Sequence, residues 1–325
     1  MNKLQPITSY IKHLAVSGLS NVFARIKSSC DLTGKCFDMP NVSYTCPLWA
    51  IIKKIKMQQI IPQTIEYDEM GLPPILYKYR DWNNPNHKKI LTENEIYLAS
   101  PADFEDEYDC KIPIRYDLLT EEEIYDLYFK SSLSMNHHFA EQQHINYALE
   151  HQQKGLLLDA ERIRELEKCF FDNFNNRFGV LSLTAACDKY AMWDYYANHN
   201  KGFCIGFHSL ALCKTPNLFS GGGIMHYYDV LPIIKFTDQN EKKYFYQVHS
   251  KLRKWKFEEE YRLTKSLTLN RKANIPNEVY AEIILGSCIS EVSRQEIIQL
   301  AKIKFKNCKV LQANLSNKKI TLTEA

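Results

Sequence analysis

The stretch Trp255-Lys-Phe-Glu-Glu-Glu-Tyr-Arg-Leu263 combines aromatic residues with three consecutive carboxylates. Its composition predicts a β-strand, in which residues two apart share a face. Alternation then divides the residues into two sets: Phe257, Glu259, Tyr261 and Leu263 on one face, and Glu258, Glu260 and Arg262 on the other. Two carboxylates and a guanidinium on one face make a poor core and a good polar site. The polar face of this strand is therefore a candidate reactive site.

The chain around this strand predicts an α+β fold. Aromatic and branched runs predict strands at residues 75–80, 96–100, 178–184, 202–207, 279–285 and 319–323. Helical patterns cover residues 120–150, 156–174, 188–198 and 290–306. Thr120 and Glu123 form a capping box at the start of the first, and Ser220–Gly223 is expected to be a loop. Because helices cluster between blocks of strands, we expect a mixed or antiparallel central sheet with flanking helices.

Residues 1–70 differ in character from the rest. The first sixty residues hold eight Lys or Arg against two Asp or Glu, although the whole chain carries only +3. Helical patterns near residues 6–28 and 47–61 precede a boundary at Met70-Gly-Leu-Pro-Pro74. We expect a basic helical N-terminal extension (1–70) followed by an α+β domain (71–325). Such an extension could meet nucleic acid, an anionic membrane surface or an acidic partner, but a solvated helix face is the simpler interpretation.

Composition narrows the class of protein. Hydrophobic residues make up 45% and charged residues 24%, as in ordinary globular proteins. The sequence has no apolar run long enough to span a membrane and no recognisable secretory signal, so we expect a cytoplasmic protein. The ten cysteines lack paired metal-ligand spacing and should be reduced thiols. His137, His144 and His151 recur every seven residues, about 10.5 Å apart along a helix, too far for one ion. We therefore expect no metal site.

An aromatic segment, residues 192–207, ends one predicted helix and begins a strand. Trp193, Tyr196 and His199 lie three residues apart and share a helical face. Such aromatic residues either pack in a core or form a platform for a ligand. Taken alone the segment favours core packing, whereas a polar strand face beside it favours a site.

Four segments resemble the bacterial family catalogued as domain-of-unknown-function number 2971. They occur in that family's order: Leu76–Arg80, Ser100–Cys110, Trp193–Phe207 and Trp255–Arg262. The resemblance covers residues 75–312 and leaves residues 1–70 outside. The second segment departs from the usual pattern, with Glu105 where Asn is common and Glu107 where Pro is common.

The order of three strands also resembles mono-ADP-ribosyltransferases. In that superfamily an arginine grips NAD, a strand with hydroxyl groups braces the nicotinamide ribose, and a final glutamate engages the ribose and acceptor. The resemblance implies these roles for Arg80, for Ser182 with Thr184, and for Glu258 with Glu260. It further implies that Tyr79, Trp193 or Tyr196 stacks on the nucleotide. His199 completes the expected NAD-binding residues.

These features lead to an expected function with one alternative. We expect an ADP-ribosyltransferase-like protein that consumes NAD and modifies a protein or nucleic acid, as toxins and defence factors do. The alternative is a non-catalytic nucleotide-sensing or protein-interaction module. In that case Arg80 would pair with Asp106 or Asp109, and Glu258 with Arg262, for structural reasons only. The transferase hypothesis requires Arg80, Ser182 and Glu260 to converge.

Overall fold

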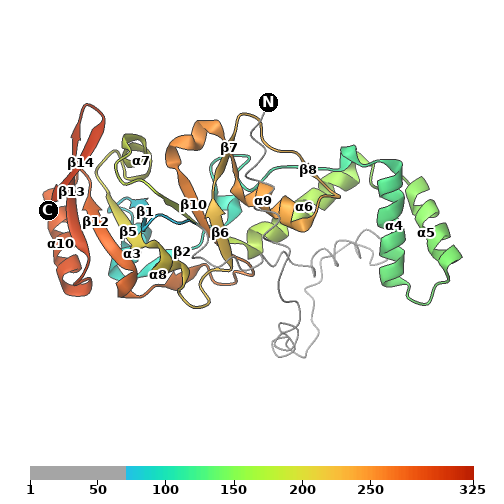
Figure 1. Ribbon diagram of the computed structural model, residues 1–325, viewed down its shortest axis with the longest axis horizontal. Helices are drawn as coiled ribbons and strands as arrows, with labels where there is room; N and C mark the ends of the chain where they lie inside the picture. Colours follow the sequence, from blue (N-terminus) through green and yellow to red (C-terminus); the bar gives the residue numbers. More distant parts are fainter. Residues whose placement is uncertain (1–70) are drawn as a thin grey trace. The chain divides into compact units, whose positions relative to one another are not determined.

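A large mixed sheet forms the centre of the described part of the chain (Figure 1). This computed structural model describes residues 71–325, so the basic extension predicted at residues 1–70 lies outside the described residues. Across the sheet the strands are β14 (Lys319–Glu324), β13 (Lys309–Ser316), β12 (Tyr280–Leu285), β5 (Phe203–His208), β1 (Ile75–Arg80), β4 (Gly179–Thr184), β10 (Glu260–Lys265) and β6 (Gly221–Ile224). Only β12 and β13 pair in parallel; the other neighbours are antiparallel. The predicted α+β class is confirmed.

Helices and short two-stranded ribbons complete the domain. The α-helices are α3 (Pro85–Thr92), α4 (Glu121–Met135), α5 (Glu141–Gln153), α6 (Ala160–Arg177), α7 (Tyr190–Tyr196), α8 (Ser209–Cys213), α9 (Asn240–His249) and α10 (Glu291–Lys304). The 3-10 turns are η3 (Pro101–Asp103), η4 (Tyr116–Leu118), η5 (Arg253–Glu258) and η6 (Asn277–Val279). The ribbons pair β2 (Glu95–Tyr97) with β11 (Lys272–Asn274), β3 (Ile114–Arg115) with β8 (Ile234–Lys235), and β7 (His226–Tyr228) with β9 (Ser250–Leu252).

Alternation along β1 produces two apolar layers. Leu76 faces a cluster that includes Leu91 of α3 and Ile297 of α10. Tyr79 faces the opposite way, toward Trp193 of α7, so α3 and α7 lie on opposite sides of the sheet (Figure 1). Each large apolar side chain that is fully buried stabilises the fold by about 1.5–3 kcal/mol. Both faces of the sheet are therefore fixed by packing.

The sheet is weakly joined between β1 and β4. These strands share one register position, Tyr77 opposite Thr184, whereas β1 pairs with β5 along its whole length. Beside that position Lys78 reaches across the junction, and its Nζ donates to the carbonyl of Ser182 at 2.6 Å. A charged side chain thus helps to connect the two parts of the sheet, β14-β13-β12-β5-β1 and β4-β10-β6.

The segment Trp255–Leu263 is only partly a strand, so the strand predicted over its whole length is wrong. Residues up to Glu258 form η5, and Glu259 adopts a left-handed conformation with φ 43°. The strand β10 begins at Glu260. Composition favoured a strand throughout, but one residue with positive φ turns the chain and ends the 3-10 helix.

Three other predictions can be scored against the structure. The capping box of Thr120 and Glu123 is confirmed, but the helix it opens ends at Met135 and α5 follows as a separate helix. The loop expected at Ser220–Gly223 is wrong, because Gly221–Ile224 forms the edge strand β6 paired with β10. A Cβ on Gly222 would lie 2.4 Å from the carbonyl oxygen of Arg262, so only glycine permits this pairing.

Candidate active site

Five charged side chains are buried together at the β10 side of the weak junction. Their exposed fractions are 0% for Arg262, 3% for Glu260, 4% for Glu258, 4% for Asp109 and 7% for Lys251. We call these five residues the Lys251 network. Charges this deep must be paired, because an isolated buried charge costs several kcal/mol. Three carboxylates and two cations leave the network with one net negative charge.

Lys251, on β9, is the centre of this network. Its Nζ lies 2.6 Å from Glu258 Oε2, 3.1 Å from Glu260 Oε2 and 3.3 Å from Asp109 Oδ2. An ammonium has three N–H donors, which matches its three carboxylate partners. Lys251 therefore holds Glu258 and Glu260 side by side although they belong to different elements.

Arg262, on β10, fixes the other side of Glu260. Its Nε donates to Glu260 Oε1 at 2.8 Å, and a terminal nitrogen donates to Asp109 Oδ2 at 2.7 Å. The second terminal nitrogen donates to the carbonyl of Val248 at 2.9 Å, and the guanidinium lies over the ring of Phe104. Planar guanidinium groups suit such charge-assisted pairing. Both oxygens of Glu260 are thus bound by cations.

The two carboxylates differ in acidity. Burial raises the pKa of Glu258, and the charge of Glu260 adds to this, although Lys251 opposes it. Burial would also raise the pKa of Glu260, but Arg262 and Lys251 together hold it well below its usual range. Tyr196 of α7 donates its hydroxyl to Glu258 Oε1. Neighbouring carboxylates with divergent pKa values are typical of acid–base pairs.

Backbone strain borders the network on two sides. Glu259 has φ 43° and Cys110, next to Asp109, has φ 59°. Left-handed conformations cost non-glycine residues about 1–2 kcal/mol and often occur at functional sites. Glu259 itself points to the surface, where it pairs with Lys189 at 3.0 Å. Glu259 is thus separated from Glu258 and Glu260 as predicted, but a left-handed turn and not strand alternation separates them. The apolar face predicted for Glu259 is wrong, because Phe257 packs in a different cluster from Tyr261 and Leu263.

Strand β4, which carries Ser182 and Thr184, lies next to the strand that carries Glu260. In the ladder between β4 and β10, Ser182 is opposite Arg262 and Thr184 is opposite Glu260. The Ser182 hydroxyl lies on the same face as Glu260 and lowers the pKa of that carboxylate further. Thr184 is buried, and its Oγ1 accepts from the amide of Ala186 at 3.2 Å. Of the two predicted residues, Ser182 contacts the network and Thr184 serves the local backbone.

Of the three aromatic residues predicted to stack on the nucleotide, two lie in the core and one contacts the network. Tyr79 and Trp193 pack edge to face with centroids 5.0 Å apart, and their exposed fractions are 2% and 0%. Their polar atoms bond to carbonyls, Tyr79 to Ala186 and Trp193 to Cys187. In this structure neither ring has a face open to a ligand, so both belong to the core. Tyr196 alone joins the aromatic segment to the carboxylates.

Two other expected binding residues lie apart from the network. His199 is exposed, and its Nδ1 is 2.8 Å from Asp194 Oδ1. Arg80 donates to the carbonyl of Tyr79 at 3.3 Å and forms no ion pair with a carboxylate of residues 71–325. Ser182 and Glu260 therefore lie on the same side of the sheet, whereas strand register places Arg80 on the opposite side and it contacts neither of them, so the required convergence of the three residues is not met.

Sequence reasoning missed two members of the network. Asp109 lies in the segment Ser100–Cys110, but no local pattern indicated that it pairs with Lys251 and Arg262. Lys251 carried no local signal, since it follows α9 on a three-residue strand. Only the parallel pairing of β9 with β7 and the course of η5 bring Lys251 to β10.

Two of the three regularly spaced histidines, His144 and His151, stabilise a helical hairpin. His144 of α5 bonds through Nδ1 to the hydroxyl of Ser132 on α4 at 2.8 Å, and both are buried. His151 bonds to the carbonyl of Tyr147. The structure of residues 71–325 contains no group of His, Cys, Asp and Glu arranged to hold a metal ion. No helix in that range combines the length and apolar character needed to cross a bilayer.

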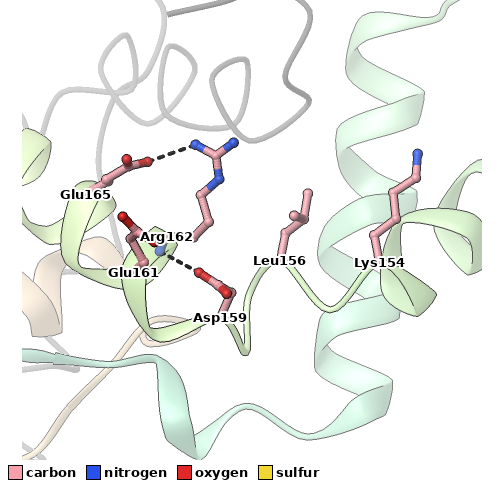
Figure 2. A pocket seen from close by; sticks show the side chains of 6 residues that line it. All are labelled: Lys154, Leu156, Asp159, Glu161, Arg162 and Glu165. Atoms are coloured by element: carbon pink, nitrogen blue, oxygen red, sulfur yellow. Dashed lines mark hydrogen bonds and ion pairs between the residues drawn. The ribbon is translucent and has the colours of Figure 1, made fainter.

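A separate surface hollow lies between α5 and α6 (Figure 2). Lys154, Leu156, Asp159, Glu161, Arg162 and Glu165 line it. Figure 2 shows Arg162 paired with Glu165, and Asp159 bound to the helix amide of residue 162. The hollow shares no residue with the Lys251 network. Its charged groups are exposed and serve the helix terminus, so the candidate site is the network.

Comparison with known proteins yields no relative. No protein-family model, no curated protein and no solved structure matches this chain.

Proposed function

We propose that this protein binds NAD and transfers ADP-ribose to a protein or nucleic-acid acceptor, with Glu258 and Glu260 as the acting carboxylates. One observation carries the proposal: a single ammonium holds two buried carboxylates whose pKa values are displaced in opposite directions. The resemblance of the strand order to mono-ADP-ribosyltransferases supplies the reaction class.

The charge of the site suits this reaction. When the bond between nicotinamide and ribose C1′ breaks, nicotinamide leaves with the electron pair and the ribose gains oxocarbenium character. A fixed negative charge stabilises that transition state. The Lys251 network carries one net negative charge, and Glu260 stays ionised because Arg262 and Lys251 lower its pKa.

The second carboxylate fits the transfer to the acceptor. A new bond forms between C1′ and the acceptor heteroatom, whose proton must be removed. Glu258 has a raised pKa, which makes it a stronger base than an ordinary glutamate. Tyr196 orients Glu258, and Ser182 holds Glu260. The resemblance implies that Arg80 binds the diphosphate of NAD.

One observation favours the alternative, a nucleotide-sensing or protein-interaction module without turnover. Both oxygens of Glu260 are already bound by cations within the protein. Buried ion pairs of this kind occur for structural reasons alone. Under this alternative the same residues shape a binding site, and NAD is bound but not consumed.

The test is nicotinamide release from labelled NAD, with transfer of label to protein and nucleic acid in a lysate. We expect Glu260→Gln and Glu258→Gln each to lower turnover by about 100-fold or more, the typical effect of losing a group that stabilises developing charge. Glu259→Gln is the matched control, because Glu259 is adjacent in sequence yet lies at the surface. Turnover that survives Glu260→Gln intact would overturn the residue assignment. If the wild-type protein shows no NAD turnover, the transferase is excluded and the binding module remains as the proposed function.

A further inference from the structure

Three basic side chains lie beside the junction of β1 and β4, on the opposite side of the sheet from the Lys251 network. Lys78 and Arg80 are two residues apart on β1 and share a strand side, and His87 is in the first turn of α3. Electrostatic interaction joins all three, because both cations act on His87 and Arg80 acts on Lys78. We call these residues the β1 basic cluster.

The β1 basic cluster has no internal counter-charge. Within residues 71–325, none of its three members forms an ion pair with a carboxylate, whereas Lys251 and Arg262 form five. The acid nearest in sequence, Asp81, uses its Oδ1 to accept from the amide of Asn83 at 2.9 Å. The positive charge of the cluster is therefore left for something outside the described residues to compensate.

Most hydrogen-bond donors of the cluster are also unused. The Nζ of Lys78 donates to Ser182, and one terminal nitrogen of Arg80 donates to the adjacent carbonyl of Tyr79. A guanidinium has five N–H donors, so most of those of Arg80 make no hydrogen bond within the described residues. Lys78, Arg80 and His87 are all partly accessible, and none of their nitrogens is buried without a partner. The remaining donors are therefore open to a ligand.

The tautomer of His87 adds a donor. Its Nδ1 accepts from the amide of Asp81 at 3.2 Å, so the neutral ring carries its proton on Nε2. Burial, followed by the charges of Arg80 and Lys78, lowers the pKa of His87 to about 4. The imidazole is thus neutral near pH 7 and presents an N–H beside two cations.

Protein atoms crowd these cations. Burial lowers the pKa of Arg80 to about 10, and burial together with Arg80 lowers the pKa of Lys78 well below its usual range. Groups that are partly accessible and yet strongly desolvated gain most from a bound anion, because the anion replaces lost water. The charges of Glu260 and Glu258 also act on Lys78, whose Nζ reaches the carbonyl of Ser182 at the junction of β1 and β4.

We propose that Lys78, Arg80 and His87 form a binding site for a phosphate or diphosphate group. Guanidinium binds phosphate oxygens in a fork, and lysine adds a point charge. The proposal rests on the proposed function in one respect only, since it assigns the site to the diphosphate of the nucleotide. It adds Lys78 and His87, which the resemblance does not name.

The experiment measures binding of inorganic diphosphate, ADP and ribose 5-phosphate to the full chain by calorimetry. We expect diphosphate and ADP to bind, and Arg80→Met and Lys78→Met each to weaken them about tenfold or more. Lys89→Met is the matched control, because Lys89 lies on the same helix as His87 but pairs with Glu93 at 3.8 Å. It should leave the affinity unchanged. Diphosphate should also raise the melting temperature of the wild-type protein and of Lys89→Met, but not of Arg80→Met.

Two outcomes would overturn the site: no binding of diphosphate at millimolar concentration, or an equal loss in Lys89→Met. Failure of the site and failure of the proposed function are distinguishable. Diphosphate binding that depends on Arg80, in a protein that never consumes NAD, keeps the site and removes the transferase. NAD turnover without diphosphate binding keeps the transferase and removes the site.

Discussion

The Lys251 network and the β1 basic cluster lie on opposite sides of the sheet beside its weakest part, and they differ in charge balance. The network pairs each of its cations with carboxylates at 2.6–3.3 Å. The cluster has no such pair within residues 71–325. A compensated network is stable by itself, whereas an uncompensated cluster gains from an anion. This difference separates what holds the fold from what is left for a ligand.

Arg262→Met should show the difference most strongly. It leaves Asp109 and Glu260 short of a buried counter-charge, and breaking a buried pair costs about 3–5 kcal/mol. In the cluster, Arg80→Met removes a charge that has no carboxylate partner and makes one long bond to the adjacent carbonyl, so it should raise the free energy of unfolding by up to about 1 kcal/mol. Urea denaturation of both variants measures the contrast. Equal changes of the same sign would remove the distinction between the two regions.

Tyr196→Phe tests the link between α7 and the network. A hydrogen bond to a charged group contributes about 1.5–3 kcal/mol, so the free energy of unfolding should fall by roughly that amount. The bond favours the ionised carboxylate, and its loss should raise the pKa of Glu258 further. We expect the acid limb of the NAD turnover profile to move to higher pH. An unchanged limb would show that Glu258 does not control it.

Acid should weaken the network through Glu260. Its pKa is lower in the folded than in the unfolded protein, so the unfolded chain takes up the proton first as the pH falls through about 4.3. The stability contributed by Glu260 is complete above that pH and declines below it by up to about 1.4 kcal/mol per pH unit. Urea midpoints between pH 5 and pH 3 should fall less steeply for Glu260→Gln. Parallel curves for the two proteins would contradict this assignment.

Glu259→Gln should have the smallest effect. The ion pair with Lys189 is exposed on both sides, and such pairs contribute about 0–1 kcal/mol. We expect a change in the free energy of unfolding within about 0.5 kcal/mol. A loss as large as that for Glu260→Gln would mean that all three consecutive glutamates act together.

Local patterns predicted the elements of this fold well but not their ends. Runs of aromatic and branched residues marked β1, β4, β5 and β12, because strand preference resides in the side chains themselves. The capping box at Thr120 marked the start of α4, because its hydrogen bonds join residues only three apart in the sequence. Where glycines pair as the edge strand β6, or a left-handed residue ends η5, tertiary contacts overrode the local preference.

The sequence alone determined the α+β class and pointed to Glu258 and Glu260 as polar residues set apart from Glu259. Only the tertiary structure decided their partners. Asp109 and Arg262 are separated by 153 residues, and no local periodicity encodes an ion pair across that distance. The tertiary structure also showed that Lys78 and Arg80 have no carboxylate partner in residues 71–325. Composition reveals how many charges a chain carries, whereas folding decides which of them are compensated.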